Sequence, residues 1–126
     1  VHVNRSPCAC RAVALRYQRG EFLNAMNPES ALRNEHLWIG LEEEAPPHRR
    51  LAVRVISGAI ARRIVCNVRP GEVLARGEKF GMIKLGSRTE LVLPDEEGLV
   101  IDVAVGDRVK AGTSVVARWN QRESGA

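Results

Sequence analysis

Aromatic residues are scarce in this chain of 126 residues, which contains one tyrosine, two tryptophans and two phenylalanines. None of them is interleaved with a basic cluster. Proteins that bind single-stranded nucleic acid use aromatic side chains as stacking platforms for the bases, so this shortage argues against a nucleic-acid partner. The formal net charge of +4 favours other anionic partners, such as phosphate groups or acidic lipid surfaces.

Cysteine is also rare, and its spacing is not that of a disulfide framework. Cys8, Cys10 and Cys66 make an odd number, which indicates free thiols in a reducing compartment. The three could supply zinc ligands, but a second close-spaced pair is missing. We therefore expect buried or incidental thiols and no metal site.

Long apolar runs are absent, since none approaches the roughly 20 residues that a membrane-spanning helix needs. We expect neither a transmembrane segment nor an opening signal peptide in this chain. The first residue is Val1 rather than Met and stands within a strand-like run. We therefore expect a fragment or processed piece of a longer protein, folded as a single domain over residues 1–126.

The dominant pattern in the sequence is that of short β-strands. Apolar and polar residues alternate at Arg11–Tyr17 and again at Leu51–Ile56. Two later runs, Gly71–Gly77 and Gly106–Gly112, share the form Gly, acid, x, apolar, x, x, Gly. This repeat predicts a mainly β fold in which two similar β-halves, each a strand–turn–strand unit like those of lipoyl domains, pack as a sandwich or barrel.

Two segments interrupt the β pattern. Asn27-Pro28-Glu29 is typical of a helix start and predicts a short helix or loop near residues 28–37. Glu42–Arg50 combines acidic residues, two prolines and arginines. We expect an exposed hairpin loop there, with its charges solvated.

Leu85-Gly86-Ser87-Arg88 allows more than one interpretation. Glycine and serine between two strand-like runs usually form a turn. Lys84 in Met82-Ile83-Lys84 could alternatively be the modified lysine of a lipoyl or biotinyl carrier barrel, although methionines do not flank it on both sides. A third possibility is that the protein cleaves its own Gly86-Ser87 bond.

Five segments of the chain carry a resemblance that bears on this choice. They are VHVNRSP at 1–7, YQRGEFLNA at 17–25, Asn34-Glu35, ISGAIARRIVC at 56–66 and GMIKLGSR at 81–88. Together, in this order and from residue 1 to about residue 117, they resemble the motifs of phosphatidylserine decarboxylases of the short prokaryotic type.

The resemblance implies self-cleavage between Gly86 and Ser87, which gives residues 1–86 (β chain) and 87–126 (α chain). Ser87 would attack the Gly86 carbonyl and would finally become a pyruvoyl group, the covalent cofactor of the family. A glycine lets the hydroxyl approach, and a serine hydroxyl needs a base to activate it. The resemblance places His2 in that role, which suits an imidazole that titrates near neutral pH.

The resemblance also implies a carboxy-lyase that converts phosphatidylserine to phosphatidylethanolamine and carbon dioxide; an ether lipid with the same headgroup is equally compatible. It implies a peripheral location on the cytoplasmic face of the membrane and a homo-oligomer. The candidates for phosphate or carboxylate contacts are Arg5, Arg62, Arg63, Lys84 and Arg88. A relative that keeps the fold without cleaving, or a carrier or binding barrel, remains the alternative.

The sequence departs from the family pattern at several positions. The upstream aspartate segment that works with the histidine does not occur in these 126 residues. Cys10 replaces a glycine, which we expect to strain a turn, and His36 replaces the arginine that follows Asn-Glu. Leu85 replaces a phenylalanine, which is a mild change.

Overall fold

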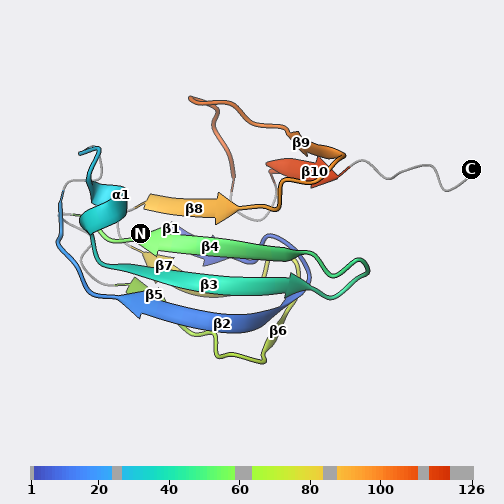
Figure 1. Ribbon diagram of the computed structural model, residues 1–126, viewed down its shortest axis with the longest axis horizontal. Helices are drawn as coiled ribbons and strands as arrows, with labels where there is room; N and C mark the ends of the chain where they lie inside the picture. The colour runs from blue at the N-terminus through green and yellow to red at the C-terminus, as the bar shows by residue number, and fades with distance from the viewer. Residues whose placement is uncertain (1, 24–26, 59–63, 84–87, 111–113, 120–126) are drawn as a thin grey trace, which may run out of the picture.

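The computed structural model describes residues 2–23, 27–58, 64–83, 88–110 and 114–119, and these residues form a mainly β fold (Figure 1). Its strands are β1 (His2–Arg5), β2 (Cys10–Gln18), β3 (His36–Glu43), β4 (Arg50–Ile56), β5 (Ile64–Cys66), β6 (Val73–Leu74), β7 (Lys79–Ile83), β8 (Arg88–Val92), β9 (Leu99–Ile101) and β10 (Ala117–Trp119). They pair antiparallel in three sheets with the orders β6-β2-β3-β4-β8, β1-β7-β5 and β10-β9. The predicted mainly β fold is confirmed.

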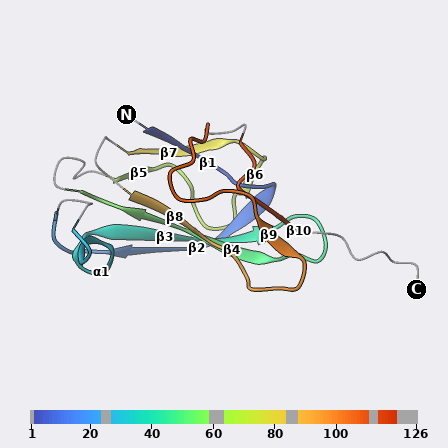
Figure 2. The same cartoon turned by 90° about the horizontal axis from the view of Figure 1, so that it is seen from above.

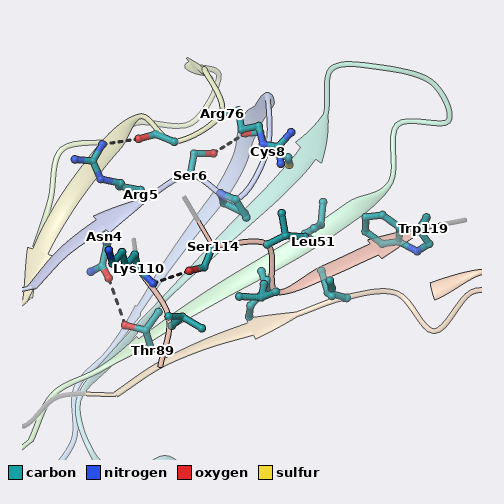
Figure 3. Close-up of a pocket in the computed structure, with 18 residues that line it drawn as sticks. Asn4, Arg5, Ser6, Cys8, Leu51, Arg76, Thr89, Lys110, Ser114 and Trp119 are labelled. Atoms are coloured by element: carbon teal, nitrogen blue, oxygen red, sulfur yellow. Dashed lines mark hydrogen bonds between the residues drawn. The ribbon is translucent and has the colours of Figure 1, made fainter. Parts of the chain in front are cut away.

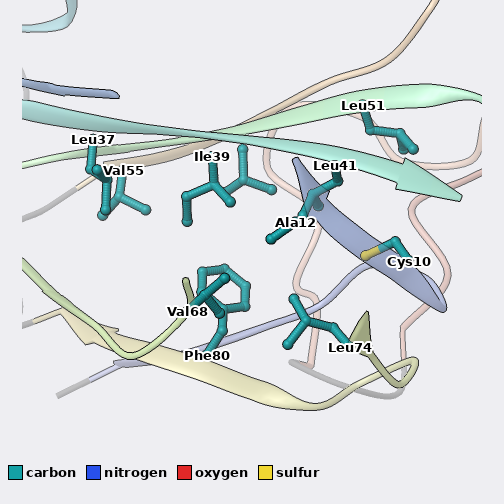
Figure 4. Packing of buried hydrophobic residues seen from close by; sticks show 11 residues of the cluster. Cys10, Ala12, Leu37, Ile39, Leu41, Leu51, Val55, Val68, Leu74 and Phe80 are labelled. Carbon is teal, nitrogen blue, oxygen red and sulfur yellow. The ribbon is translucent and has the colours of Figure 1, made fainter. Parts of the chain in front are cut away.

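The five-stranded and three-stranded sheets form two layers, as the view from above shows (Figure 2). Along β3 and β4 every second side chain points inward, because successive residues of a strand face opposite sides of the sheet. The core between the layers is shown in Figure 4 and consists of Cys10, Ala12, Leu37, Ile39, Leu41, Leu51, Val53, Val55, Val68, Leu74 and Phe80. The alternation seen in the sequence therefore marks the core-facing side of the larger sheet.

The repeated glycine runs form matching turns in two hairpins, β5–β7 and β9–β10. Glu72 N–H donates to the Arg69 carbonyl at 3.1 Å, and Asp107 N–H donates to the Ala104 carbonyl at 3.0 Å. Gly71 and Gly106, 35 residues apart in the sequence, hold the third turn position with φ values of 94° and 95°. Type II turns require such a φ at this position, and glycine adopts it without steric cost.

The two hairpins differ in what covers them. Leu74 in the first hairpin is 2% exposed because β6 pairs with β2 at the edge of the larger sheet. Val109, the residue at the corresponding place 35 positions later, is 54% exposed. The strands of the second hairpin lie beyond the C-terminal end of β8 (Figure 1), and Trp119 of this hairpin packs against the core cluster.

The two interruptions of the β pattern are shorter or less exposed than predicted. The helix α1 covers only Ser30–Arg33, after Asn27 Oδ1 accepts the Glu29 N–H at 2.9 Å. It cannot continue to residue 37, because β3 begins at His36. In the loop between β3 and β4 the charges are not all solvated, since Arg49 pairs with Glu96 at 2.7 Å and with Glu43 at 3.5 Å.

Candidate functional site

The strand register brings the N-terminal strand next to the segment that contains Gly86-Ser87. His2 on β1 is the partner of Ile83 on β7, and Asn4 is the partner of Gly81. Strand β8 begins at Arg88 and lies in the other sheet. The strands on either side of the predicted cleavage site thus lie in different sheets, and β7 ends at Ile83, opposite His2.

Several of the predicted site residues lie outside the described residues. These are Gly86 and Ser87 at the predicted cleavage site, and Lys84, Arg62 and Arg63 among the candidate cations. For His2 the described part is its position on β1, opposite Ile83. The strand pairing thus places the backbone of His2 next to Ile83, which precedes the predicted cleavage site in the sequence.

A buried asparagine, Asn34, forms hydrogen bonds near Arg88, the first described residue after the predicted cleavage site. Asn34 accepts the Leu23 N–H at 2.7 Å and donates from Nδ2 to the carbonyls of Leu23 at 2.8 Å and Ser57 at 2.7 Å. Ser57 follows Ile56, which is the partner of Arg88 at the start of β8. The Asn-Glu motif seen in the sequence therefore fixes the backbone alongside the segment that leads out of 84–87.

A cleft of about 540 Å³ begins near these elements and runs along the inner side of β8. Asn4 and Thr89 lie at one end and Trp119 at the other (Figure 3). Thr89 Oγ1 donates to Asn4 Oδ1 at 3.4 Å, which links β1 to β8. Most of the remaining wall is apolar and comprises Pro7, Leu51, Leu91, Leu93, Val109, Val115, Val116, Ala117 and Trp119.

The charged residues that line the cleft are all cations. They are Arg5, Arg76 and Lys110, and no aspartate or glutamate is among the described lining residues. Arg5 donates from Nη1 to the Gly77 carbonyl at 2.9 Å, which holds its guanidinium at the turn after β6. Sequence reasoning identified Arg5 but missed Arg76 and Lys110, although both stand inside the repeated glycine runs.

Arg88, the other described candidate cation, lies away from the cleft. Residues paired directly across strands share a face of the sheet, so Thr89 shares the inner face with Val55, and Arg88 shares the outer face with Ile56. On that outer face Arg88 Nη2 lies 3.1 Å from Glu90 Oε2. The structure therefore brings Arg5 to the cleft but not Arg88.

Two departures from the family motifs are accommodated locally. Cys10 begins β2, is fully buried and has no positive φ, so the expected turn strain is not observed. His36 is buried, and its Nδ1 lies 2.8 Å from the Asn34 carbonyl oxygen. The imidazole thus contacts the backbone of the same motif rather than the cleft.

Comparison of the sequence with known proteins identifies its family. The family model described as phosphatidylserine decarboxylase matches residues 1–117. The chain belongs to the phosphatidylserine decarboxylase family. It is 51% identical over 121 residues to the phosphatidylserine decarboxylase proenzyme of Rhodopirellula baltica, covering 96% of this chain and 50% of that protein. The proenzyme of Nitrosomonas eutropha is 44% identical over 121 residues, covering 94% and 53%.

Other comparisons set the extent of this relationship. The Nitratidesulfovibrio vulgaris proenzyme is 46% identical over 118 residues, with 94% of this chain and 52% of that protein covered. The chain thus spans about half the length of the curated relatives it matches. None of the solved structures matches it. Among the described residues, no helix is long and apolar enough to cross a membrane.

Proposed function

We propose that this chain is the self-processing part of a pyruvoyl-dependent decarboxylase that converts phosphatidylserine to phosphatidylethanolamine and carbon dioxide. One observation carries the proposal. The β1–β7 register sets His2 opposite Ile83, at the start of the segment that contains Gly86-Ser87. The cleft begins at Asn4, two residues after His2 on β1, and at Thr89, the second residue of β8. The printed names of the relatives, which call them proenzymes, also support a processed chain.

In the proposed cleavage the Ser87 hydroxyl attacks the Gly86 carbonyl and an ester replaces the amide. His2 takes the hydroxyl proton, because a serine oxygen is a weak nucleophile until a base removes that proton. Elimination and hydrolysis then leave residues 1–86 and a second chain that begins with the modified Ser87. Asn34 supports this step indirectly, since it holds Ser57 next to the start of β8.

Ser87 would carry the pyruvoyl group, which supplies an electron sink for decarboxylation. The polar end of the cleft fits a carbonyl group attached at residue 87, because Asn4 and Thr89 offer hydrogen-bonding groups there. His2 is our candidate for returning a proton to the substrate carbon after carbon dioxide leaves. The missing aspartate partner of the family would have to act from outside these 126 residues.

The lining of the cleft supports an anionic lipid as substrate. Arg5, Arg76 and Lys110 supply positive charge for a phosphate or carboxylate. The apolar wall, which includes Leu91 and Val109, suits the hydrocarbon part of a lipid. We propose that the protein works at the cytoplasmic face of the membrane as a peripheral homo-oligomer, on either a diacyl or an ether lipid with the serine headgroup.

The test is the intact mass of the protein expressed from its complete gene, compared with a Ser87→Ala variant. We expect the wild type to give two chains split at Gly86-Ser87, the second of which lacks a free amine and is reduced by borohydride. Ser87→Ala should stay whole, whereas Ser114→Ala, which changes another serine at the cleft, should cleave like the wild type. A wild-type protein that stays as one chain would contradict the proposal and favour a relative that keeps the fold without cleaving.

A further inference from the structure

The loop that joins β9 to β10 leaves branched apolar side chains in solvent. Val105 is fully exposed, and Ile101, Val109 and Val115 are each more than half exposed. Apolar side chains scattered singly over a surface are normal, whereas several gathered in one place mark a contact with a partner or a membrane. This loop is therefore a candidate contact surface.

Hydrogen bonds hold the tip of this loop in a fixed turn. Asp107 N–H donates to the Ala104 carbonyl at 3.0 Å, and Ala104 N–H donates to the Asp107 carboxylate at 2.9 Å. Val105 occupies the second position of the turn, where its side chain is 107% exposed. Further along the loop, Lys110 N–H donates to the Ser114 hydroxyl at 2.7 Å, and Ser114 N–H donates to the Lys110 carbonyl at 3.0 Å. A preformed loop loses little conformational entropy when it meets a partner.

Positive charge accompanies these apolar side chains. Arg108 and Lys110 are exposed, and neither forms an ion pair with another of the described residues. Of the two acids in the loop, Asp102 pairs with Arg118 at 3.2 Å, and Asp107 accepts the turn hydrogen bond described above. The groups of the loop that lack an ion pair therefore carry a net positive charge, which suits an anionic surface.

The loop also forms part of the cleft. Val109, Lys110 and Val115 are among its lining residues (Figure 3). The acidic residues 95–97 precede β9 and so stand at the other end of that strand from the loop. The surface that the loop contacts is therefore continuous with the apolar wall of the cleft.

We propose that the β9–β10 loop docks on an anionic lipid bilayer, with Val105 inserted among the headgroups and with Arg108 and Lys110 against the lipid phosphates. This inference deepens the proposed function, on which it rests for the lipid nature of the substrate. A turn of this size suits a bilayer better than a protein, because a stable protein interface takes roughly 800 Å² from each partner. Reversible binding to a bilayer needs only some buried apolar area and attraction to anionic lipids.

The test uses the protein expressed from its complete gene and vesicles that lack the substrate headgroup. We expect the protein to float with vesicles of phosphatidylcholine and phosphatidylglycerol, and to bind less at high salt or to phosphatidylcholine alone. Because phosphatidylglycerol has no serine headgroup, docking is measured separately from decarboxylation. Binding without decarboxylation of phosphatidylserine would overturn the proposed function alone. Decarboxylation of a soluble short-chain phosphatidylserine without vesicle binding would overturn the docking alone.

Single substitutions assign the binding to this loop. Val105→Asp should weaken vesicle binding roughly tenfold, because the inserted valine is lost and a carboxylate faces anionic lipid. Arg108→Glu should weaken it by a similar factor. Val73→Asp is the matched control, because Val73 is also an exposed valine but lies on β6, on the opposite side of the larger sheet from the loop (Figure 1). It should bind like the wild type.

Hydrogen exchange gives a local readout that other membrane contacts of the full-length protein do not disturb. We expect amide exchange in residues 102–110 to slow when anionic vesicles are added. The proposal is overturned if the wild type does not float, if Val105→Asp binds like the wild type, or if Val73→Asp weakens binding equally. It is also overturned if vesicles leave the exchange of this loop unchanged, which would indicate that another protein segment covers the loop.

Discussion

Gly20, which follows β2, and Asn34, which precedes β3, are tightly constrained by their neighbours. The backbone at Gly20 runs beside that of Arg33 and Asn34, with Glu21 N–H donating to the Arg33 carbonyl at 2.8 Å and Glu35 N–H donating to the Glu21 carbonyl at 2.9 Å. A Cβ on Gly20 would lie 2.3 Å from the Arg33 carbonyl oxygen. The backbone that carries Asn34 can approach this closely only because residue 20 has no side chain.

Gly20→Ala should therefore destabilise the protein, because a backbone oxygen cannot move aside without breaking these hydrogen bonds. We expect the free energy of unfolding to fall by roughly 1–3 kcal/mol, measured by urea unfolding with an unchanged m-value. Gly40→Ala is the matched control, since its Cβ would meet a Val13 side-chain carbon at 3.4 Å. It should change the free energy by less than about 1 kcal/mol. Equal losses in the two variants would count against the close approach at Gly20.

At the scale of elements, Arg49 connects the β3–β4 loop to the second hairpin. Its guanidinium carbon lies 4.4 Å from the centre of the Trp119 ring on β10. Its Nε donates to Glu96 at 2.7 Å, just before β9. The side chain is 20% exposed, whereas that of the neighbouring Arg50 is 82% exposed and lies 3.6 Å from Glu42. The adjacent arginines therefore have different structural roles.

Arg49→Ala should loosen the second hairpin, because the variant removes both the ion pair with Glu96 and the contact with Trp119. We expect a loss of about 1–3 kcal/mol in the free energy of unfolding and a change in tryptophan fluorescence. Arg50→Ala should cost less than about 0.5 kcal/mol, since an exposed ion pair contributes little. If both variants behave alike in urea unfolding, Arg49 does not anchor the hairpin.

At the scale of the whole molecule, the β7–β8 connection joins two strands that lie in different layers. The proposed cleavage falls within this connection, yet β8 stays paired with β4 from Ala52↔Val92 to Ile56↔Arg88. Leu91 and Leu93 on the same side pack against the core cluster. A cut at Gly86-Ser87 would thus remove a covalent link without removing these contacts.

The two pieces should therefore remain together after cleavage. We expect size-exclusion chromatography to give one peak that contains both pieces, and a denaturing gel to separate them. Leu91→Asp should weaken the association, because it buries a carboxylate against Val53 and the core. Val92→Asp, on the exposed outer face, should elute like the wild type. Separation of the wild-type pieces under native conditions would show that the β4–β8 pairing does not hold them.

Much of the fold could be predicted from the sequence, because alternation and glycine turns are local signals. The strands around Arg11–Tyr17 and Leu51–Ile56 were predicted in this way, as was the repeat at Gly71 and Gly106. The cleft could not be predicted, since it depends on how the second hairpin lies against β8. The sequence did not predict Arg76 and Lys110 as cleft residues, because the cleft is formed by segments that are distant in the sequence. It did not predict the Ser6–Cys10 contact, because that contact depends on a bend that composition does not reveal.

The paired hairpins have a consequence for the history of the molecule. A duplicated hairpin would account for two copies with the same turn, of which one has a buried Leu74 and the other an exposed Val109. The first copy closes the interior, so its apolar residues are constrained by packing. The second copy contributes less to this packing, so its exposed positions should tolerate more substitutions. Variation in this family should therefore concentrate in the second copy, where, under the proposed function, substrate preference could shift without loss of the fold.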